Sequence, residues 1–409
     1  MSSVCHAHVT TAFYNLPHMA DFSPISPRKI LILSVSAGAG HARAAEAIRV
    51  QANIDYPHET VVHVDVMQYA TAAFRKVYTD FYMHLVNKAP SLWGYLYHYS
   101  NEAKHDSTME NLRRRLERWN AKALLRFIKE FEPDAIICTH FLPAEILSRL
   151  IARGELACPV WVQVTDFDLH RMWVHEGMHG YFAANQEVAF RMREYGIADN
   201  QIHVTGIPIM PAFNQVLDRQ VCAKELGCDP HKTTVMLMSG GGGVGDLPSL
   251  ARRLLNIAGE DLSQAFQLIV LTGKNQQAFQ ALDAMRNGFC NRLFPVGFTR
   301  EVERLMICAD LIVTKPGGLT TSECLAMRLP MIVNAPIPGQ EERNADYILE
   351  SGAAMKAVDE SALCFRIQQL LKEPQRLGKM REAGARIATP NAAKQVIATV
   401  MNSLVQIRL

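Results

Sequence analysis

Short apolar runs alternate along the chain with segments that carry apolar residues at three- and four-residue spacing. The runs predict buried strands, and the segments between them predict amphipathic helices. In the first half the predicted strands cover residues 29–35, 61–66, 135–139, 160–165 and 180–184. In the second half they cover residues 234–238, 267–271, 291–296, 311–314 and 331–333. Because alternating strands and helices form parallel sheets with helical covers, we expect an α/β protein with two doubly wound, Rossmann-like units.

The boundary between the two units is expected at Gly206-Ile-Pro-Ile-Met-Pro-Ala-Phe213, where two prolines limit helix formation. The first domain would then cover residues 29–212, and the second would begin at residue 213. Residues 1–28 precede the first predicted strand and are interpreted as an N-terminal extension. A length of 409 residues fits this division, since domains average roughly 150 residues.

Composition narrows the range of functions. The chain is 49% hydrophobic and 20% charged, which is typical of a globular protein with real cores. A formal net charge of +2 is too small to create a field around the whole molecule, so no nucleic-acid partner is indicated. Nine cysteines without a Cys-x-x-Cys pair favour a reducing, cytoplasmic environment. No apolar run approaches the roughly 18 residues of a membrane span, so we expect any membrane contact to be peripheral, at an inner membrane face.

Three glycine-rich loops follow predicted strands, where open parallel sheets bind ligands. In the first, Ser36-Ala-Gly-Ala-Gly-His41, the glycines allow a tight turn and His41 lies in the first turn of the next helix. An imidazole has an unperturbed pKa of about 6.5 and could accept the proton of an attacking hydroxyl. The alternative interpretation is a surface histidine near a helix cap.

The second loop, residues 239–246, fits G-x-G-x-x-G through Gly240, Gly242 and Gly245. A dinucleotide site would also require an acidic residue about 20 positions later, whereas Leu271-Thr-Gly-Lys274 follows the next strand. NAD binding is therefore disfavoured. Two interpretations of this loop remain: it binds a nucleotide diphosphate, or it is only a turn between a strand and a helix.

The third loop, Lys315-Pro-Gly-Gly-Leu319, leads into a helix expected near Thr320. Its free N–H groups and the positive end of the helix dipole suit a diphosphate. Glu323 lies one turn into that helix, where it could accept hydrogen bonds from ribose hydroxyls or only stabilise the helix N-terminus. After the next strand, Gln340 and Glu341 offer amide and carboxylate groups that match sugar hydroxyls, although a solvated helix start would also explain them.

A polar loop at the end of the 160–165 strand contains Asp166, His170 and Trp173. These residues could orient an acceptor or support His41, or they could only satisfy loop backbone groups. The following 175–179 segment matches H-E-x-x-H, but Gly177 weakens a helix there and no third histidine follows at the required spacing. We therefore expect no metal site.

The segment from Tyr69 to Tyr99, which includes Trp93 and Tyr95, is rich in aromatic and basic residues, and Arg113 and Arg114 follow it. Aromatic rings and basic clusters are typical of membrane interfaces. The pattern indicates a surface that contacts the membrane and the acceptor, and the alternative is a helical hairpin packed on the sheet.

Together these motifs resemble those of the diacylglycerol glycosyltransferases, a family that includes monogalactosyldiacylglycerol synthases and processive glucosyltransferases. The resemblance rests on five segments in the same order: Ser36–His41, Thr165-Asp166, Gly206–Ile209, Thr314–Gly318 and Pro338–Glu341. It implies a GT-B fold with an acceptor domain first, a UDP-sugar domain at residues 213–390, and a C-terminal helix at 391–409 that returns to the first domain. The 166–175 loop departs from the family pattern, so the resemblance does not identify the acceptor.

The resemblance also implies roles for individual residues. His41 would be the general base, with Asp166 beside it in the catalytic centre. The donor residues would be Gly242, Gly243, Gly317 and Gly318 at the diphosphate with Lys274 or Lys315, Glu323 at ribose, Gln340 and Glu341 at the sugar, Phe298 at uracil, and Asn344 near the same pocket.

The implied reaction is transfer of glucose or galactose from UDP-glucose or UDP-galactose to diacylglycerol, with inversion to a β-glycoside and without a cofactor or metal. Charge would develop on the leaving diphosphate, which the N–H groups of the loops could stabilise. The alternatives are a peptidoglycan-type UDP-N-acetylglucosamine transferase, a UDP-sugar 2-epimerase and a non-catalytic nucleotide-binding scaffold.

Overall fold

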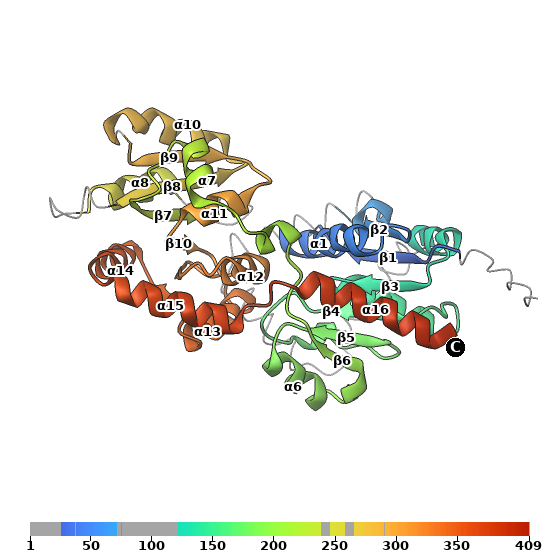
Figure 1. Ribbon diagram of the computed structural model, residues 1–409. Coiled ribbons are helices and arrows are strands. Elements are labelled where there is room, and N and C mark those ends of the chain that lie inside the picture. Colours follow the sequence, from blue (N-terminus) through green and yellow to red (C-terminus); the bar gives the residue numbers. More distant parts are fainter. Residues whose placement is uncertain are drawn as a thin grey trace, which may run out of the picture.

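The computed structural model contains two α/β domains (Figure 1). It describes residues 26–36, 38–71, 75, 122–238, 246–257, 266–289 and 291–408. The aromatic and basic residues Trp93, Tyr95, Arg113 and Arg114, the glycines Gly242 and Gly243, and the extension up to residue 25 lie outside these ranges. Within them, no helix combines the length and the apolarity needed to cross a bilayer.

The first sheet has the strand order β2-β1-β3-β4-β5-β6, and its pairings are parallel. Its strands are β1 (Lys29–Ser34), β2 (Thr60–Asp65), β3 (Ala135–Cys138), β4 (Val160–Gln163), β5 (Gly180–Ala183) and β6 (Ile202–Val204). Its helices are α1 (Ala39–Asp55), a helix at 122–131, α5 (Phe141–Ala152) and α6 (Gln186–Glu194), with 3-10 turns η1 (Val66–Tyr69), η2 (Arg171–Trp173) and η3 (Asp199–Gln201).

The second sheet has the order β12-β11-β10-β7-β8-β9, again with parallel pairings. Its strands are β7 (Thr233–Met238), β8 (Phe266–Gly273), β9 (Leu293–Gly297), β10 (Leu311–Thr314), β11 (Met331–Asn334) and β12 (Ala354–Ala357). Its helices are α7 (Arg219–Leu226), α8 (Leu247–Leu255), α10 (Gln276–Met285), α11 (Val302–Cys308), α12 (Gly318–Ala326), α13 (Gln340–Glu350), α14 (Glu360–Lys372) and α15 (Pro374–Ile387), with the 3-10 turn η5 (Arg286–Phe289).

The α/β class with two doubly wound sheets, expected from the sequence, is confirmed. The ten predicted strands correspond to β1–β5 and β7–β11, but β6 and β12 were missed. Both are short edge strands with mixed burial, so neither shows the continuous apolar run of a strand that is covered on both faces.

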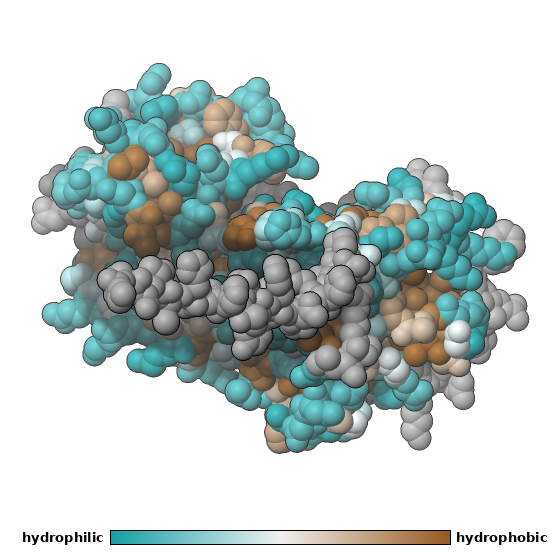
Figure 2. Space-filling view, turned by 45° about the vertical axis from the view of Figure 1, so that its right-hand side comes forward, coloured by the Kyte–Doolittle hydropathy of each residue, from teal (hydrophilic) through white to brown (hydrophobic). Residues whose placement is uncertain are grey.

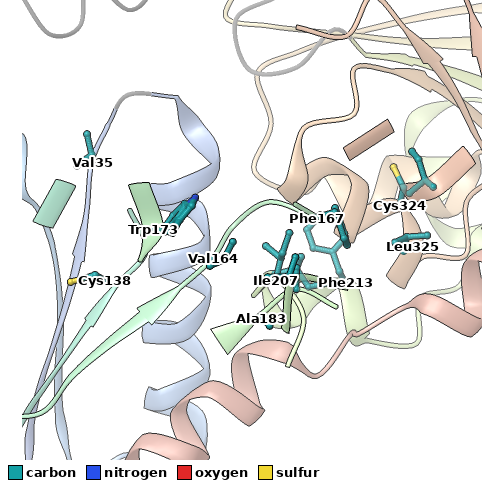
Figure 3. Close-up of a cluster of buried hydrophobic side chains, with 14 of the residues drawn as sticks. Val35, Cys138, Val164, Phe167, Trp173, Ala183, Ile207, Phe213, Cys324 and Leu325 are labelled. Carbon is teal, nitrogen blue, oxygen red and sulfur yellow. The ribbon is translucent and has the colours of Figure 1, made fainter. Parts of the chain in front are cut away.

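A hydrophobic core extends across both domains. Phe167, Ile207 and Phe213 from the first part of the chain belong to the same buried cluster as Cys324 and Leu325 of α12 (Figure 3). Phe213 lies in the 3-10 turn η4 (Pro211–Asn214), within the segment that connects β6 to α7. The two sheets are therefore joined by packed side chains as well as by the chain itself.

The C-terminal helix α16 (Ala392–Arg408) packs against α1 (Figure 1). Val396, Ile397 and Val400 are fully buried in one cluster with residues of β1 and α1. Nη1 of Arg28 donates to the carbonyl oxygen of Met401 at 3.1 Å, and His179 bonds the hydroxyl of Ser403 at 2.9 Å. The last helix of the chain thus completes the core of the first domain.

Candidate active site

The N-termini of α1 and α12 lie side by side where the two domains meet. A Cβ atom added at Gly40 would lie 3.9 Å from the Cβ atom of Leu319, and one added at Gly318 would overlap the carbonyl oxygen of Thr165. The first turns of both helices have free N–H groups and positive dipole ends. The boundary between the domains therefore combines two helix ends that favour an anion. The space-filling view shows a notch between the two lobes (Figure 2).

His41 is held at this boundary by two threonines. Its Nδ1 atom lies 3.1 Å from the carbonyl oxygen of Thr139 and 2.8 Å from Oγ1 of Thr165. Because a carbonyl oxygen can only accept, the contact with Thr139 requires the proton on Nδ1. Nε2 then carries the free lone pair, which is the state that a general base requires. The hydroxyl of Thr139 also donates to the backbone carbonyl of His41 at 2.9 Å.

The surroundings of His41 keep the imidazole neutral. Burial lowers its pKa to about 4, and the hydrogen bond with Thr139 opposes this shift. The ring of His140 lies 4.6 Å from that of His41, and burial holds the pKa of His140 well below its usual value. His41 is therefore unprotonated at Nε2 at neutral pH.

Asp166 lies in the loop after β4, in contact with the second domain. It is buried, and its carboxylate accepts hydrogen bonds from Nε2 of Gln340 at 2.7 Å and Nδ2 of Asn344 at 3.3 Å. Burial raises the pKa of Asp166 to about 6, although both hydrogen bonds favour the ionised form. The carboxylate thus connects the loop after β4 to helix α13.

Both ends of the Asn344 side-chain amide form hydrogen bonds with the first domain. Asn344 is fully buried, and its Oδ1 accepts a hydrogen bond from the backbone N–H of Phe167 at 2.8 Å. The ring of Phe167 stacks on Tyr347 of α13, with centroids 4.7 Å apart. Residues 165–167 are therefore fixed to the second domain by their backbone and by their side chains.

Lys315, Gly317 and Glu341 gather around the start of α12. Oε2 of Glu341 accepts from the backbone N–H of Ile337 at 2.7 Å, and a Cβ atom at Gly317 would lie 3.8 Å from its other oxygen. Burial raises the pKa of Glu341, and the charge of Lys315 opposes that shift. Lys315 also lines a cavity of about 120 Å³ at the carboxyl ends of β7, β10 and β11.

Glu323 lies one turn further along α12. It is 6% exposed, and burial raises its pKa to about 7. The charge of Arg43, from α1, opposes this shift, whereas that of Glu303, from α11, reinforces it. A carboxylate in this position is close to the first domain as well as to the second.

Phe298 follows β9 and is 62% exposed, with Nζ of Lys274 5.7 Å from its ring centroid. His170 and Trp173, by contrast, are buried in the loop after β4. Nδ1 of His170 accepts from the backbone N–H of Met172, and the ring of Trp173 lies 6.1 Å from that of His41. Their contact with an acceptor stays a prediction.

The sequence interpretation did not include Thr139 or His140, and it assigned no role to the hydroxyl of Thr165. All three lie within two residues of the end of β3 or β4, and that position was the available signal. The 175–179 segment forms a turn before β5. In the ranges that the structure describes, no group of three or more His, Cys, Asp or Glu side chains is placed to hold a metal ion.

The arrangement of two facing α/β domains is shared with solved structures. The S. aureus MnaA–UDP structure superposes with a TM-score of 0.60 at 14% identity, covering 92% of this chain and 97% of the other. MurG from Acinetobacter baumannii gives a TM-score of 0.56 at 15% identity, covering 92% and 100%. The fold is therefore GT-B, the class in which a ligand site lies between two Rossmann-like domains.

Two family models match the chain. The monogalactosyldiacylglycerol (MGDG) synthase model matches residues 41–209, and the glycosyltransferase family 28 C-terminal domain matches residues 234–398. Relatives named processive diacylglycerol beta-glucosyltransferase are 27% identical over 374 residues in Bacillus cereus (strain G9842) and 25% identical over 375 residues in Bacillus subtilis (strain 168). These matches cover 91% of this chain and 93% and 95% of the relatives. The first domain therefore belongs to the monogalactosyldiacylglycerol synthase family and the second to glycosyltransferase family 28, and the chain is a glycosyltransferase.

Proposed function

We propose that this enzyme transfers glucose or galactose from UDP-glucose or UDP-galactose to diacylglycerol or a related membrane lipid, forming a β-glycoside. The observation that carries the proposal is the placement of His41, whose Nε2 is free to accept a proton beside the N-terminus of α12. The names of the relatives support the lipid acceptor, and the UDP in a structure of the same fold supports the donor.

The reaction requires one bond to form as another breaks. The oxygen of the lipid hydroxyl attacks the anomeric carbon, its proton moves to Nε2 of His41, and the bond from that carbon to the diphosphate breaks. UDP leaves with the electron pair on the opposite face of the sugar, which inverts the configuration. A general base of this kind typically contributes 10²–10⁴-fold to the rate.

The second domain would hold the donor. The N–H groups of Gly317 and Gly318 and the cation of Lys315 would stabilise charge on the leaving diphosphate. Glu323 would accept from ribose, Gln340 and Glu341 would contact the sugar, and the backbone at Phe298 would contact uracil. Gly242 and Gly243 would complete the diphosphate site from outside the described residues.

For Asp166 and Asn344 we propose a positioning role. The carboxylate oxygens of Asp166 and the amide of Asn344 are engaged in hydrogen bonds between the domains. Asp166 would orient the amide of Gln340 so that Oε1 remains available to a sugar hydroxyl. In this scheme no metal or other cofactor takes part, and full activity in the presence of EDTA is expected.

We further propose peripheral binding at the inner face of a membrane. Trp93, Tyr95, Arg113 and Arg114 would contact lipid headgroups, and His170 and Trp173 would border the path of the acceptor. Binding to vesicles with and without anionic lipid, compared between the natural chain and a variant with Arg113 and Arg114 replaced by Ser, tests this assignment.

The test of the function supplies UDP-glucose and UDP-galactose separately with diacylglycerol vesicles and identifies the lipid product by mass spectrometry and the anomer by NMR. His41→Ala is expected to lower the rate of product formation by about 10²–10⁴-fold, whereas His231→Ala, at an exposed position of the second domain, leaves it unchanged. Absence of glycolipid from both donors would overturn the lipid proposal. Incubation with UDP-N-acetylglucosamine alone distinguishes an epimerase, since it needs no acceptor.

A further inference from the structure

Thr165 contacts both halves of the active site. Its hydroxyl lies 2.8 Å from Nδ1 of His41, within the first domain. Its carbonyl oxygen lies against Gly318 at the start of α12, so closely that only glycine fits there. Its neighbour Asp166 binds Gln340 of α13. One residue therefore touches the imidazole on one side and the donor helix on the other.

The hydrogen-bond chemistry defines what the hydroxyl of Thr165 can do. Nδ1 carries a proton because the carbonyl of Thr139 accepts from it, so Oγ1 of Thr165 is a second acceptor for the same N–H. When Nε2 accepts a proton, the ring becomes positively charged. Hydrogen bonds to a charged group are stronger than those to a neutral one, so both acceptors then stabilise the imidazolium.

Two acceptors also define the plane of the ring. With the hydrogen bond to Thr139 alone, the imidazole could rotate about the axis of that hydrogen bond. The second hydrogen bond, to Thr165, limits this rotation. Thr139 follows β3 and Thr165 follows β4, and these strands are adjacent in the sheet. Thr165 is 6% exposed, so water does not readily replace its hydroxyl.

We propose that Thr165 is a positioning residue for His41 that links alignment of the base to seating of the donor helix α12. The proposal rests on the proposed function, in which His41 is the base. A shift of α12 away from the first domain would release the backbone of Thr165, and the imidazole would lose its second acceptor. The base is thus aligned only when the two domains are in contact at Gly318.

Thr165→Val tests the proposal because valine keeps the shape of the side chain and removes only the hydroxyl. We expect kcat to fall by about ten- to a hundredfold, since orientation contributes much of the effect of a general base. KM for the UDP-sugar is expected to stay within about twofold, because the substitution leaves the backbone contact between Thr165 and Gly318 unchanged. Thr165→Ser, which retains the hydroxyl, should recover most of the lost kcat.

A structural role alone would give a different result. If Thr165→Val keeps the natural kcat, or if Thr165→Ser is as slow as Thr165→Val, the proposal is wrong. Should Thr165→Val fail to fold, Thr165→Ser and Thr165→Ala form a second pair that differs only in the hydroxyl, and equal kcat values in that pair would overturn it. Failure of the proposed function is recognised separately, because the natural chain would then form no glycolipid from either donor, or His41→Ala would remain active.

Discussion

Nε2 of Gln340 donates a 2.7 Å hydrogen bond to Oδ2 of Asp166, and this bond joins the two domains of the enzyme. The two residues are 174 positions apart in the sequence. Asp166 lies in the loop after β4 of the first domain, and Gln340 begins helix α13 of the second domain. The carboxylate is therefore buried at a contact that any separation of the domains would expose.

Asp166 should make the stability of the protein depend on pH. Burial raises its pKa from 3.8 to about 6, so between these values the folded chain binds the proton more tightly than the unfolded chain. Protonation of Asp166 therefore stabilises the folded chain, by an amount on the order of 3 kcal/mol. This contribution is complete below about pH 4 and is lost as the pH rises through about 6. Asparagine does not titrate, so the unfolding free energy of Asp166→Asn in urea should increase relative to that of the natural chain as the pH rises from about 4 through about 6. Asp199→Asn, at an exposed site, should show no such change.

Gly318→Ala should disturb the contact between the domains. The new Cβ atom would overlap the carbonyl oxygen of Thr165, and backbone must then move. We expect a loss of about 1–3 kcal/mol in unfolding free energy together with a lower kcat. Gly317→Ala is the matched control for stability, because the nearest atom to its Cβ is 3.8 Å away and its φ of −63° suits any residue. Equal urea midpoints for the two variants would contradict the prediction.

The low pKa of His41 should appear in the pH dependence of turnover. An ordinary histidine, with a pKa of about 6.5, would be mostly protonated and inactive as a base at about pH 5.5. With a pKa of about 4, His41 remains neutral there, so kcat at saturating donor should change little between about pH 7.5 and 5.5. Saturating donor separates this effect from titration of Glu323, whose pKa is about 7. Asp166, whose pKa is about 6, also titrates in this range, so the comparison is repeated in Asp166→Asn. A tenfold fall in kcat that persists in that variant would show that His41 titrates normally.

Ile397→Ala in α16 should destabilise the first domain. The side chain of Ile397 is fully buried in the cluster that contains Ile32 of β1 and Ile48 of α1. Truncation of such a side chain costs about 2–5 kcal/mol, which urea unfolding followed by circular dichroism would detect. Val405→Ala, at a position 44% exposed on the same helix, should change stability by less than about 0.5 kcal/mol. A small effect at both positions would mean that α16 does not contribute to this core.

The central strands were predictable because each is covered on both faces. Strands such as β1 and β8 are buried along nearly their whole length, and a continuous apolar run reports such burial directly. The edge strands β6 and β12 have only three and four residues with mixed burial, so their pattern resembles that of loops. Their positions depend on the neighbouring strands with which they pair.

The sequence by itself determined the two doubly wound units and the glycine-rich loops at the ends of their strands, because apolar periodicity and turn chemistry are local properties. Tertiary structure alone decided that Thr139 and Thr165 both reach His41, since these residues are 98 and 124 positions away and meet only through the order of strands in the sheet. It also decided that the amide of Asn344 binds the backbone of Phe167, which requires the two domains to pack against each other. Such contacts depend on how separate elements fold together, and no local pattern encodes them.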